Sequence, residues 1–252
     1  MSSRDRLRRQ GEAMRRRLFG ASTDAADSDF ERYIVETTYG GIWSRPGLGL
    51  ADRMVCTLAS LCAVGQLPQL RRYVAAALAV GLPREAPFTI FAQIGIYAGF
   101  GASEAAIEAT KLVYRERGVE LPEASSNDVS LEELDRRGRD LMAKLHGERG
   151  ARGYAAPENP FTSRLYPMTI PYGYGTIWHW PGLALRQRAM VSVAGFTALQ
   201  LRDQLQKFGQ SARTLGLSVD EICEAIIQTA PYSGYAPALN ALRWLGDVLG
   251  DE

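Results

Sequence analysis

One segment of this 252-residue chain occurs twice, and the repeat limits what the chain can fold into. Residues 39–48, with the sequence YGGIWSRPGL, return at residues 174–183 as YGTIWHWPGL. The offset of 135 residues then holds without a gap as far as Gly99 and Gly234. A long ungapped match of this kind indicates two diverged copies of one structural unit, fused head to tail.

The match also extends upstream, with a different offset. Gly11, Leu18 and Gly20 correspond to Gly138, Leu145 and Gly147, an offset of 127 residues, so copy two carries a short insertion near residues 150–157. Residues 119–127 have the composition of a linker. We therefore expect a first unit at residues 1–122 and a second unit at residues 128–252.

The pattern of apolar residues within each copy predicts an all-α fold. Residues 50–64 and 184–199 are rich in Ala, Leu and Met, which favour helix, and residues 69–80 and 204–215 continue as a second predicted helix. Gly81 and Gly216 follow these segments, as glycine commonly does at a helix end. No segment has the alternation and turn residues of a hairpin.

Charge and cysteine content exclude several classes of protein. With 29 Lys and Arg against 28 Asp and Glu, the chain has no basic field for nucleic acid or an anionic membrane. The longest apolar runs are too short to span a bilayer. Three cysteines are too few for a disulfide scaffold, which favours a reducing cytoplasmic location, and we expect Cys56, Cys62 and Cys223 to be small core residues.

The motifs shared by the two copies resemble the carboxymuconolactone decarboxylase superfamily, which includes the alkylhydroperoxidase D proteins. The resemblance rests on residues 43–48, on Arg53 at the start of a helix, and on the stretch from Gln93 to Gly99. The copy-two features are Trp178, Pro181, Gly182, Leu183, Arg188, Gly216, Leu217, Gln228 and residues 232–234. The resemblance covers nearly the whole chain, once per copy, and implies two tandem units of that helical fold.

The resemblance also implies what this chain lacks. The peroxidase branch needs a Glu after the helix-heading Arg, a Cys-x-x-Cys pair and a His four residues on. The Glu position holds Met54 and Ala189, and the remaining positions hold Gln66, Gln69 and Tyr73 in copy one and Leu201, Gln204 and Phe208 in copy two. A thiol peroxidase is therefore nearly excluded. The decarboxylase branch generally keeps the Glu and His, and these are also replaced.

Three residues are candidates for chemistry. His179 stands where copy one has Ser44, and an imidazole suits general acid catalysis at neutral pH; alternatively it is a surface residue. Arg188, like Arg53, could bind a substrate carboxylate through its guanidinium, although a structural ion pair with a carboxylate such as Glu36 or Glu221 is the favoured interpretation. Tyr73 falls at the former relay position.

Aromatic and amide side chains around these positions predict a binding pocket. The candidates for substrate binding are Tyr39, Trp43, Arg53, Gln69, Gln93, Tyr97, Tyr174, Trp178, Trp180, Gln228 and Tyr232. Such a sparsely polar, aromatic pocket suits an aromatic or cyclic acid. The amides and tyrosines could equally tie helices together.

These observations predict a cofactor-independent, decarboxylase-like lyase acting on a small cyclic or aromatic carboxylic acid or lactone, in a biosynthetic or aromatic-catabolic pathway. Alternatives are an isomerase or cyclase, or a non-catalytic binding or assembly protein. Two distant histidines and no paired carboxylates give no metal-ligand pattern. The resemblance also implies a homo-oligomer, a trimer first and a dimer second, with sites between units.

Overall fold

The computed structural model describes residues 2–20, 28–123, 128–153 and 156–250, and within these ranges the chain is helical with no strand. The predicted all-α fold is confirmed. In copy one the helices are α1 (Ser3–Phe19), α2 (Asp29–Ile34), the π-helix η1 (Val35–Trp43), α3 (Leu50–Ala63), α4 (Leu67–Ala77), the 3-10 turn η2 (Leu78–Val80), α5 (Ala86–Ala98) and α6 (Phe100–Glu116).

Copy two repeats this order of elements. It contains α7 (Leu131–His146), η3 (Gly147–Ala151), η5 (Thr162–Arg164), α8 (Tyr166–Thr169), the π-helix η6 (Ile170–Tyr174), η7 (Ile177–His179), α9 (Leu185–Leu199), α10 (Arg202–Thr214), α11 (Val219–Ser233) and α12 (Tyr235–Leu249). Each long helix therefore has a counterpart: α1 with α7, α3 with α9, α4 with α10, α5 with α11 and α6 with α12.

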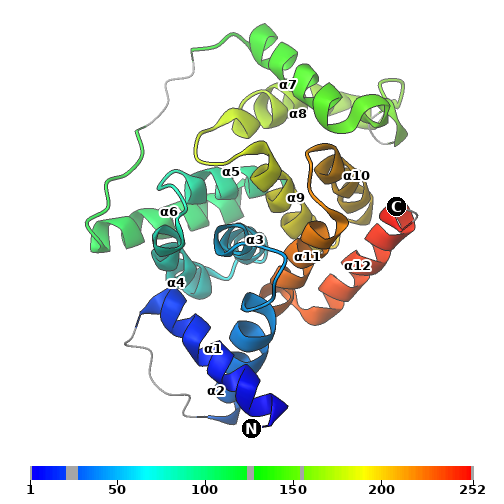
Figure 1. Ribbon diagram of the computed structural model, residues 1–252. Coiled ribbons are helices and arrows are strands. Elements are labelled where there is room, and N and C mark those ends of the chain that lie inside the picture. Colours follow the sequence, from blue (N-terminus) through cyan, green and yellow to red (C-terminus); the bar gives the residue numbers. More distant parts are fainter. Residues whose placement is uncertain (1, 21–27, 124–127, 154–155, 251–252) are drawn as a thin grey trace.

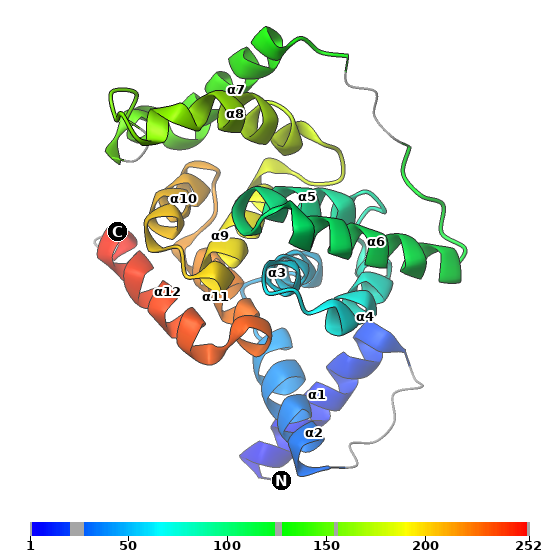
Figure 2. The same cartoon turned by 180° about the vertical axis from the view of Figure 1, so that it is seen from behind.

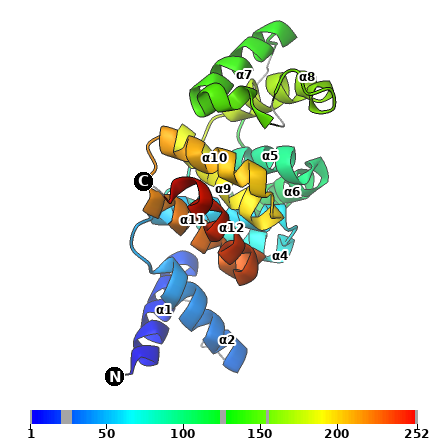
Figure 3. The same cartoon turned by 90° about the vertical axis from the view of Figure 1, so that its right-hand side faces the viewer.

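The counterpart helices α3 and α9 pack against each other at the centre of the molecule, and α5 and α11 pack against both of them. Figures 1 and 2 show this central group between two projecting ends, with α1 and α2 at one end and α7 and α8 at the other. The view from the side in Figure 3 shows the same separation. The two copies therefore share one core.

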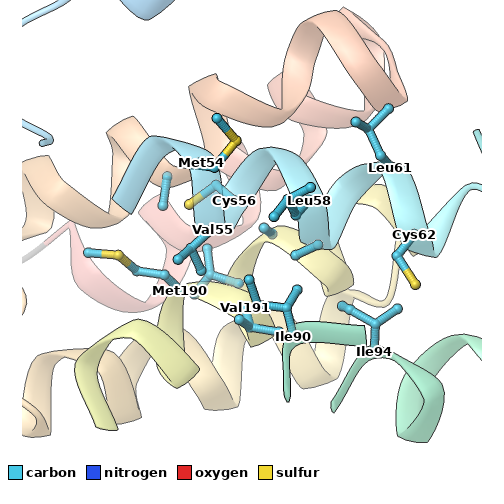
Figure 4. Close-up of a cluster of buried hydrophobic side chains, with 14 of the residues drawn as sticks. Met54, Val55, Cys56, Leu58, Leu61, Cys62, Ile90, Ile94, Met190 and Val191 are labelled. Carbon is cyan, nitrogen blue, oxygen red and sulfur yellow. The ribbon is translucent and has the colours of Figure 1, made fainter. Parts of the chain in front are cut away.

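Figure 4 shows part of that core, in which side chains from both copies meet. Val55 of α3 lies beside Met190 of α9, Ile90 of α5 lies beside Val191 of α9, and all four are fully buried. Apolar area removed from water in this way is the main favourable term in folding.

Glycine allows close helix crossings at both projecting ends. A Cβ atom on Gly40 of η1 would stand 2.2 Å from the Leu7 carbonyl oxygen of α1, and a Cβ atom on Gly175 would stand 2.0 Å from the Leu134 carbonyl oxygen of α7. Gly11 and Gly138 make the reciprocal approach to Val35 and Ile170. These glycines let the leading helix of each copy cross its π-helix at backbone distance.

The predicted helix boundaries need small corrections. Helix α4 begins at Leu67 and not at Gln69, because Pro68 occupies the first turn, where its missing N–H is tolerated. Gly81 and Gly216 adopt the left-handed conformation expected at a helix end, with φ of 88° and 86°. Part of the predicted linker, residues 124–127, lies outside the described residues.

Candidate functional site

Two pockets lie at equivalent positions in the two copies. The copy-one pocket encloses about 280 Å³ and is lined by Arg15, Glu31, Ile34, Thr38, Tyr39, Leu61, Gln66, Gln69, Arg72, Tyr73, Pro231 and Tyr232. The copy-two pocket encloses about 550 Å³ and is lined by Ile96, Tyr97, Phe161, Thr162, Leu165, Tyr166, Thr169, Gly173, Tyr174, Trp178, Phe196, Leu201, Gln204 and Phe208. Most lining residues of one pocket are the repeat counterparts of those in the other.

Each pocket takes a tyrosine from the opposite copy. Tyr232, on α11 of copy two, lines the copy-one pocket, and Tyr97, on α5 of copy one, lines the copy-two pocket. This exchange follows from the packing of α5 against α9 and of α11 against α3. Neither pocket is therefore built from one copy alone.

The π-helices set the position of one tyrosine in each pocket. Tyr39 lies within η1, and Tyr174 is the last residue of η6, where the Gly175 N–H donates to the Ile170 carbonyl oxygen at 2.9 Å. Short π-helical segments are frequent at functional sites because the wider turn redirects side chains. No pattern in the sequence predicted this geometry.

The copy-one side of the core contains a buried ion pair. The fully buried Arg53 donates to Glu224 Oε2 at 2.7 Å and to Gln228 Oε1 at 3.0 Å, and it also donates to the Arg45 and Pro46 carbonyl oxygens. Arg45 binds the same carboxylate. Burial raises the pKa of Glu224, but the hydrogen bonds and charges of the two arginines outweigh burial and lower it overall.

The sequence-based prediction that Glu36 or Glu221 pairs with one of the repeated arginines is wrong. Glu36 binds Arg4 and Glu221 binds Arg186, whereas Glu224 pairs with Arg53. Glu224 comes from the opposite copy, so spacing along the chain gave no signal for the pair.

Arg188, the counterpart of Arg53, has no such partner. Thr89 stands at the position equivalent to Glu224, and among the described residues Arg188 donates only to the carbonyl oxygens of Ile177 and Trp180. Burial lowers the pKa of Arg188 to about 10, so it remains a cation at neutral pH. The copy-two side of the core therefore holds a buried positive charge without a carboxylate beside it.

Gln93 connects this arginine to the copy-two pocket. Its Nε2 donates to the Arg188 carbonyl oxygen at 2.8 Å, to Ser192 Oγ at 3.0 Å and to the Tyr97 hydroxyl at 3.3 Å. The Tyr97 hydroxyl also bonds Ser192 Oγ at 2.8 Å, and burial raises the pKa of Tyr97. Gln93 and Tyr97 thus form a network with the backbone of Arg188, whereas in copy one the Arg53 guanidinium bonds the Gln228 side chain directly.

A series of hydrogen-bonded tyrosine hydroxyls lies at the copy-one pocket. Trp43 Nε1 donates to the Tyr232 hydroxyl at 2.6 Å, Tyr232 donates to the Tyr73 hydroxyl at 2.8 Å, and Tyr73 donates to the Tyr39 hydroxyl at 3.3 Å. Burial and the neighbouring Tyr232 raise the pKa of Tyr73 well above its usual value.

In copy two, Phe208 replaces Tyr73 and has no hydroxyl, so the chain of tyrosine hydroxyls is interrupted. A histidine forms a different set of hydrogen bonds there. His146, 1% exposed at the end of α7, bonds the Tyr174 hydroxyl through Nε2 at 3.2 Å and Ser211 Oγ through Nδ1 at 2.8 Å. Burial, with the charges of Lys207 and Arg149, lowers the pKa of His146 to about 3. The imidazole is therefore neutral at physiological pH.

The predicted site residues divide between the two pockets and do not form one. Tyr39, Gln69, Tyr73 and Tyr232 line the copy-one pocket, with Trp43 bonded to them, whereas Tyr97, Tyr174 and Trp178 line the copy-two pocket. His179 is exposed, with its ring bonded to the Tyr174 carbonyl oxygen at 3.0 Å, and neither His179 nor Trp180 is among the residues that line the two pockets.

Two features of the copy-two pocket were not predicted from the sequence. His146 occupies the position that Phe19 has in copy one, and its hydrogen bonds depend on the crossing of α7 with η6. Phe161 and Leu165, 82% and 68% exposed, follow the copy-two insertion and lie at the pocket. An insertion that lengthens the chain beside a pocket is the one signal that could have indicated them.

None of the three cysteines lines either of the two pockets. Cys56 and Cys62 are buried, Cys223 is half-buried, and all three are free thiols. Burial raises the pKa of each thiol, to about 12 for Cys62, which opposes thiolate formation. Within the described residues, no group of three or more His, Cys, Asp or Glu side chains offers a metal-ligand set.

Comparisons with known proteins agree with the repeat. The profile described as "Carboxymuconolactone decarboxylase family" matches twice, at residues 28–112 and 164–247. The chain is 31% identical over 102 residues to the 4-carboxymuconolactone decarboxylase of Acinetobacter baylyi, an alignment covering 40% of this chain and 75% of the relative. It is 36% identical over 90 residues to an uncharacterized 15.0 kDa protein of Paracoccus denitrificans, covering 34% of this chain and 66% of that protein.

Among the described residues, no helix combines the length and the apolar character needed to cross a membrane.

Proposed function

Because the chain belongs to the carboxymuconolactone decarboxylase family, we propose that it is a decarboxylase-like lyase that works without a cofactor on a small cyclic or aromatic carboxylic acid or lactone, and that the reaction takes place in the copy-two pocket. The observation that carries this proposal is the Tyr174–His146–Ser211 hydrogen-bond relay at the wall of an apolar cavity of about 550 Å³.

The size and lining of this cavity support a ring-shaped substrate. Its walls include Trp178, Phe196 and Phe208, and cavities of several hundred Å³ suit ligands of one or two rings. Apolar walls also favour loss of carbon dioxide, because they solvate a localised carboxylate less well than the more delocalised charge of the transition state.

The buried charge of Arg188 supports an anionic substrate. Arg188 lies within the network of Gln93 and Tyr97, and no carboxylate among the described residues neutralises it. Its positive potential at the Tyr97 wall attracts a substrate carboxylate without direct contact, because charge interactions are weakly screened in a buried site. The sequence suggested that Arg188 could contact the substrate carboxylate itself. We propose instead that Arg188 acts through its charge, without contact.

Tyr174 supplies the proton, and a hydrogen bond to His146 orients its hydroxyl. Ser211 Oγ donates to the Lys207 carbonyl oxygen at 3.0 Å, so it accepts from His146 Nδ1–H, and the unprotonated Nε2 accepts the Tyr174 hydroxyl hydrogen. The carbon–carbon bond to the carboxylate breaks, its electron pair stays on the substrate carbon, and carbon dioxide leaves. Tyr174 then gives its hydroxyl proton to that carbon, and the resulting tyrosinate regains a proton from water, so each turnover takes up one proton.

Two residues predicted as catalytic have other places in this proposal. Tyr73 lies in the copy-one pocket, where its hydroxyl is bonded to both Tyr232 and Tyr39. The general-acid role predicted for His179 stays a separate prediction, because its exposed ring contacts the Tyr174 backbone and not the cavity lining.

Mass spectrometry of reactions with carboxylated lactones and aromatic β-keto acids tests the proposal. We expect loss of carbon dioxide that falls by about 10²- to 10⁴-fold in Tyr174→Phe, the usual contribution of a general acid, and remains near normal in the copy-one counterpart Tyr39→Phe. The opposite pattern would contradict the assignment to copy two. Loss of activity in His179→Ala alone would return the acid role to His179.

Two other outcomes would favour the alternatives. A product of unchanged mass but altered retention, dependent on Tyr174, would indicate an isomerase or cyclase. Binding without turnover across the panel would favour a ligand-binding protein that kept the family's fold.

A further inference from the structure

The hydroxyl chain in the copy-one pocket has a fixed direction. An indole Nε1–H can only donate, so the Tyr232 oxygen accepts from Trp43, and the Tyr232 hydroxyl donates to Tyr73 at 2.8 Å. By the same argument Tyr73 donates to Tyr39. The chain therefore runs one way, from the core toward Tyr39.

Tyr39 is where this chain ends. Its oxygen accepts from Tyr73, and no acceptor for its own hydroxyl hydrogen occurs among the described residues. Hydrogen bonds in series polarise one another, so the last O–H of a one-way chain is a strengthened donor. Because Tyr39 lines the pocket, that donor is available to a ligand that offers an acceptor oxygen.

The charges around this pocket also favour an anion. Arg72 contributes a cation to the lining. The Arg72 guanidinium carbon lies 4.0 Å from the centre of the Phe19 ring, and none of the described carboxylates forms an ion pair with it. Stacking on the ring holds the guanidinium at the pocket while its N–H groups remain available to a carboxylate.

We infer that the copy-one pocket is a second binding site, separate from the copy-two pocket, which takes a small carboxylic acid of one ring through the Tyr39 hydroxyl and the Arg72 guanidinium. Its volume of about 280 Å³ restricts the ligand to that size. The copy-two pocket has no equivalent donor, because Phe208 replaces Tyr73 and the Tyr174 hydroxyl donates to His146 Nε2. The inference does not rest on any activity of copy two.

Isothermal titration calorimetry of the full chain tests it, with benzoate as the probe and benzamide as its uncharged analogue. We expect wild-type protein to bind benzoate at least about tenfold more tightly than benzamide. A hydrogen bond to a charged group contributes about 1.5–3 kcal/mol, so Tyr39→Phe should weaken benzoate binding about tenfold or more. Benzoate also belongs to the class of acids proposed for the copy-two pocket, so the titration is fitted with two sites, and the matched variant Tyr174→Phe should leave the site that depends on Tyr39 unchanged.

Two further variants separate a lost contact from a damaged fold. Arg72 is exposed, so Arg72→Gln leaves the core intact and should weaken benzoate but not benzamide. Tyr73→Phe gives copy one the residue found in copy two, and by interrupting the chain it should weaken benzoate about threefold, less than Tyr39→Phe does. Benzoate binding that is unaffected by both Tyr39→Phe and Arg72→Gln, or that is lost in Tyr174→Phe alone, would overturn the inference.

Discussion

At the scale of single residues, one substitution between the copies changes the charge of a buried site. Glu224 neutralises Arg53, whereas Thr89, at the equivalent position, uses its hydroxyl to bond the Pro181 carbonyl oxygen and leaves Arg188 as a cation. A buried charge without a counter-ion reduces stability. The buried cation on the copy-two side therefore does not serve stability, and we expect it to serve the binding of an anion.

His146 allows a test at this scale through the pH dependence of folding. The pKa of His146 is lowered from 6.5 to about 3, so between these values the unfolded chain binds a proton that the folded chain does not. The stability associated with neutral His146 is present above pH 6.5 and is lost as the pH falls toward 3. The loss in that interval is about 1.4 kcal/mol per pH unit.

We expect the variant His146→Phe, which introduces the residue type of its counterpart Phe19, to lack this dependence. Urea unfolding of both proteins at pH 5.5 and pH 4.5 should show that the stability of the wild type relative to the variant falls by about 1.4 kcal/mol over this interval. A difference that is constant with pH would mean that His146 is already protonated in the folded chain.

Part of the site could be predicted from residue types, and part could not. The aromatic residues of the repeat motif indicated pocket walls because their types and spacing are visible along the chain. The Glu224–Arg53 pair and the His146–Tyr174 bond join residues 171 and 28 positions apart, and they exist only because particular helices cross. Residue spacing carries no signal for such contacts.

At the scale of secondary structure, the crossing of α7 with η6 positions Tyr174, and Gly175 makes the crossing possible. An added Cβ atom would stand 2.0 Å from the Leu134 carbonyl oxygen and 2.6 Å from the Pro171 carbonyl oxygen. Both are backbone atoms, so relief requires the two segments to move apart. The hydrogen bond from Tyr174 to His146 would then lengthen.

We predict that Gly175→Ala destabilises the chain by about 2 kcal/mol or more, in the range of overpacked sites. The control is Gly246→Ala in α12, where a Cβ atom would meet nothing within 4 Å. There the replacement of a helical glycine should stabilise by about 0.5–1 kcal/mol. Thermal unfolding of both variants compares the two effects, and equal shifts in the same direction would contradict the proposed close crossing.

The helices themselves could be predicted well, because apolar periodicity and glycine at helix ends are local signals. Ser218 and Glu221 form the reciprocal capping box that their spacing predicts. Ser130 accepts from the Glu133 N–H in the same way, but the Glu133 carboxylate binds Arg136 and Arg137. The π-helical geometry of η1 and η6 depends on the helices that cross them and has no local pattern in the sequence.

At the scale of the whole molecule, the two sequence repeats are not two separate cores. Helix α3 packs against α9 and α11, and α9 also packs against α5, so the central helices of each copy are covered by the other copy. The tyrosine exchange places Tyr97 and Tyr232 in the opposite pockets. The division at residues 1–122 and 128–252 is therefore a division of sequence, and it stays a prediction as a division into folding units.

This arrangement predicts the behaviour of the separated copies. A fragment of residues 128–252 alone would expose the faces of α9 and α11 that α3 and α5 cover in the intact chain, and buried apolar area is what offsets the entropy of folding. We expect each fragment alone to lack cooperative thermal unfolding as a monomer, and an equimolar mixture with residues 1–122 to recover the helical circular dichroism of the full chain. Size-exclusion chromatography with light scattering should then find a one-to-one complex. A fragment that unfolds cooperatively as a monomer would show that each copy has a sufficient core of its own, and the shared helical interface would then be a docking surface between two domains.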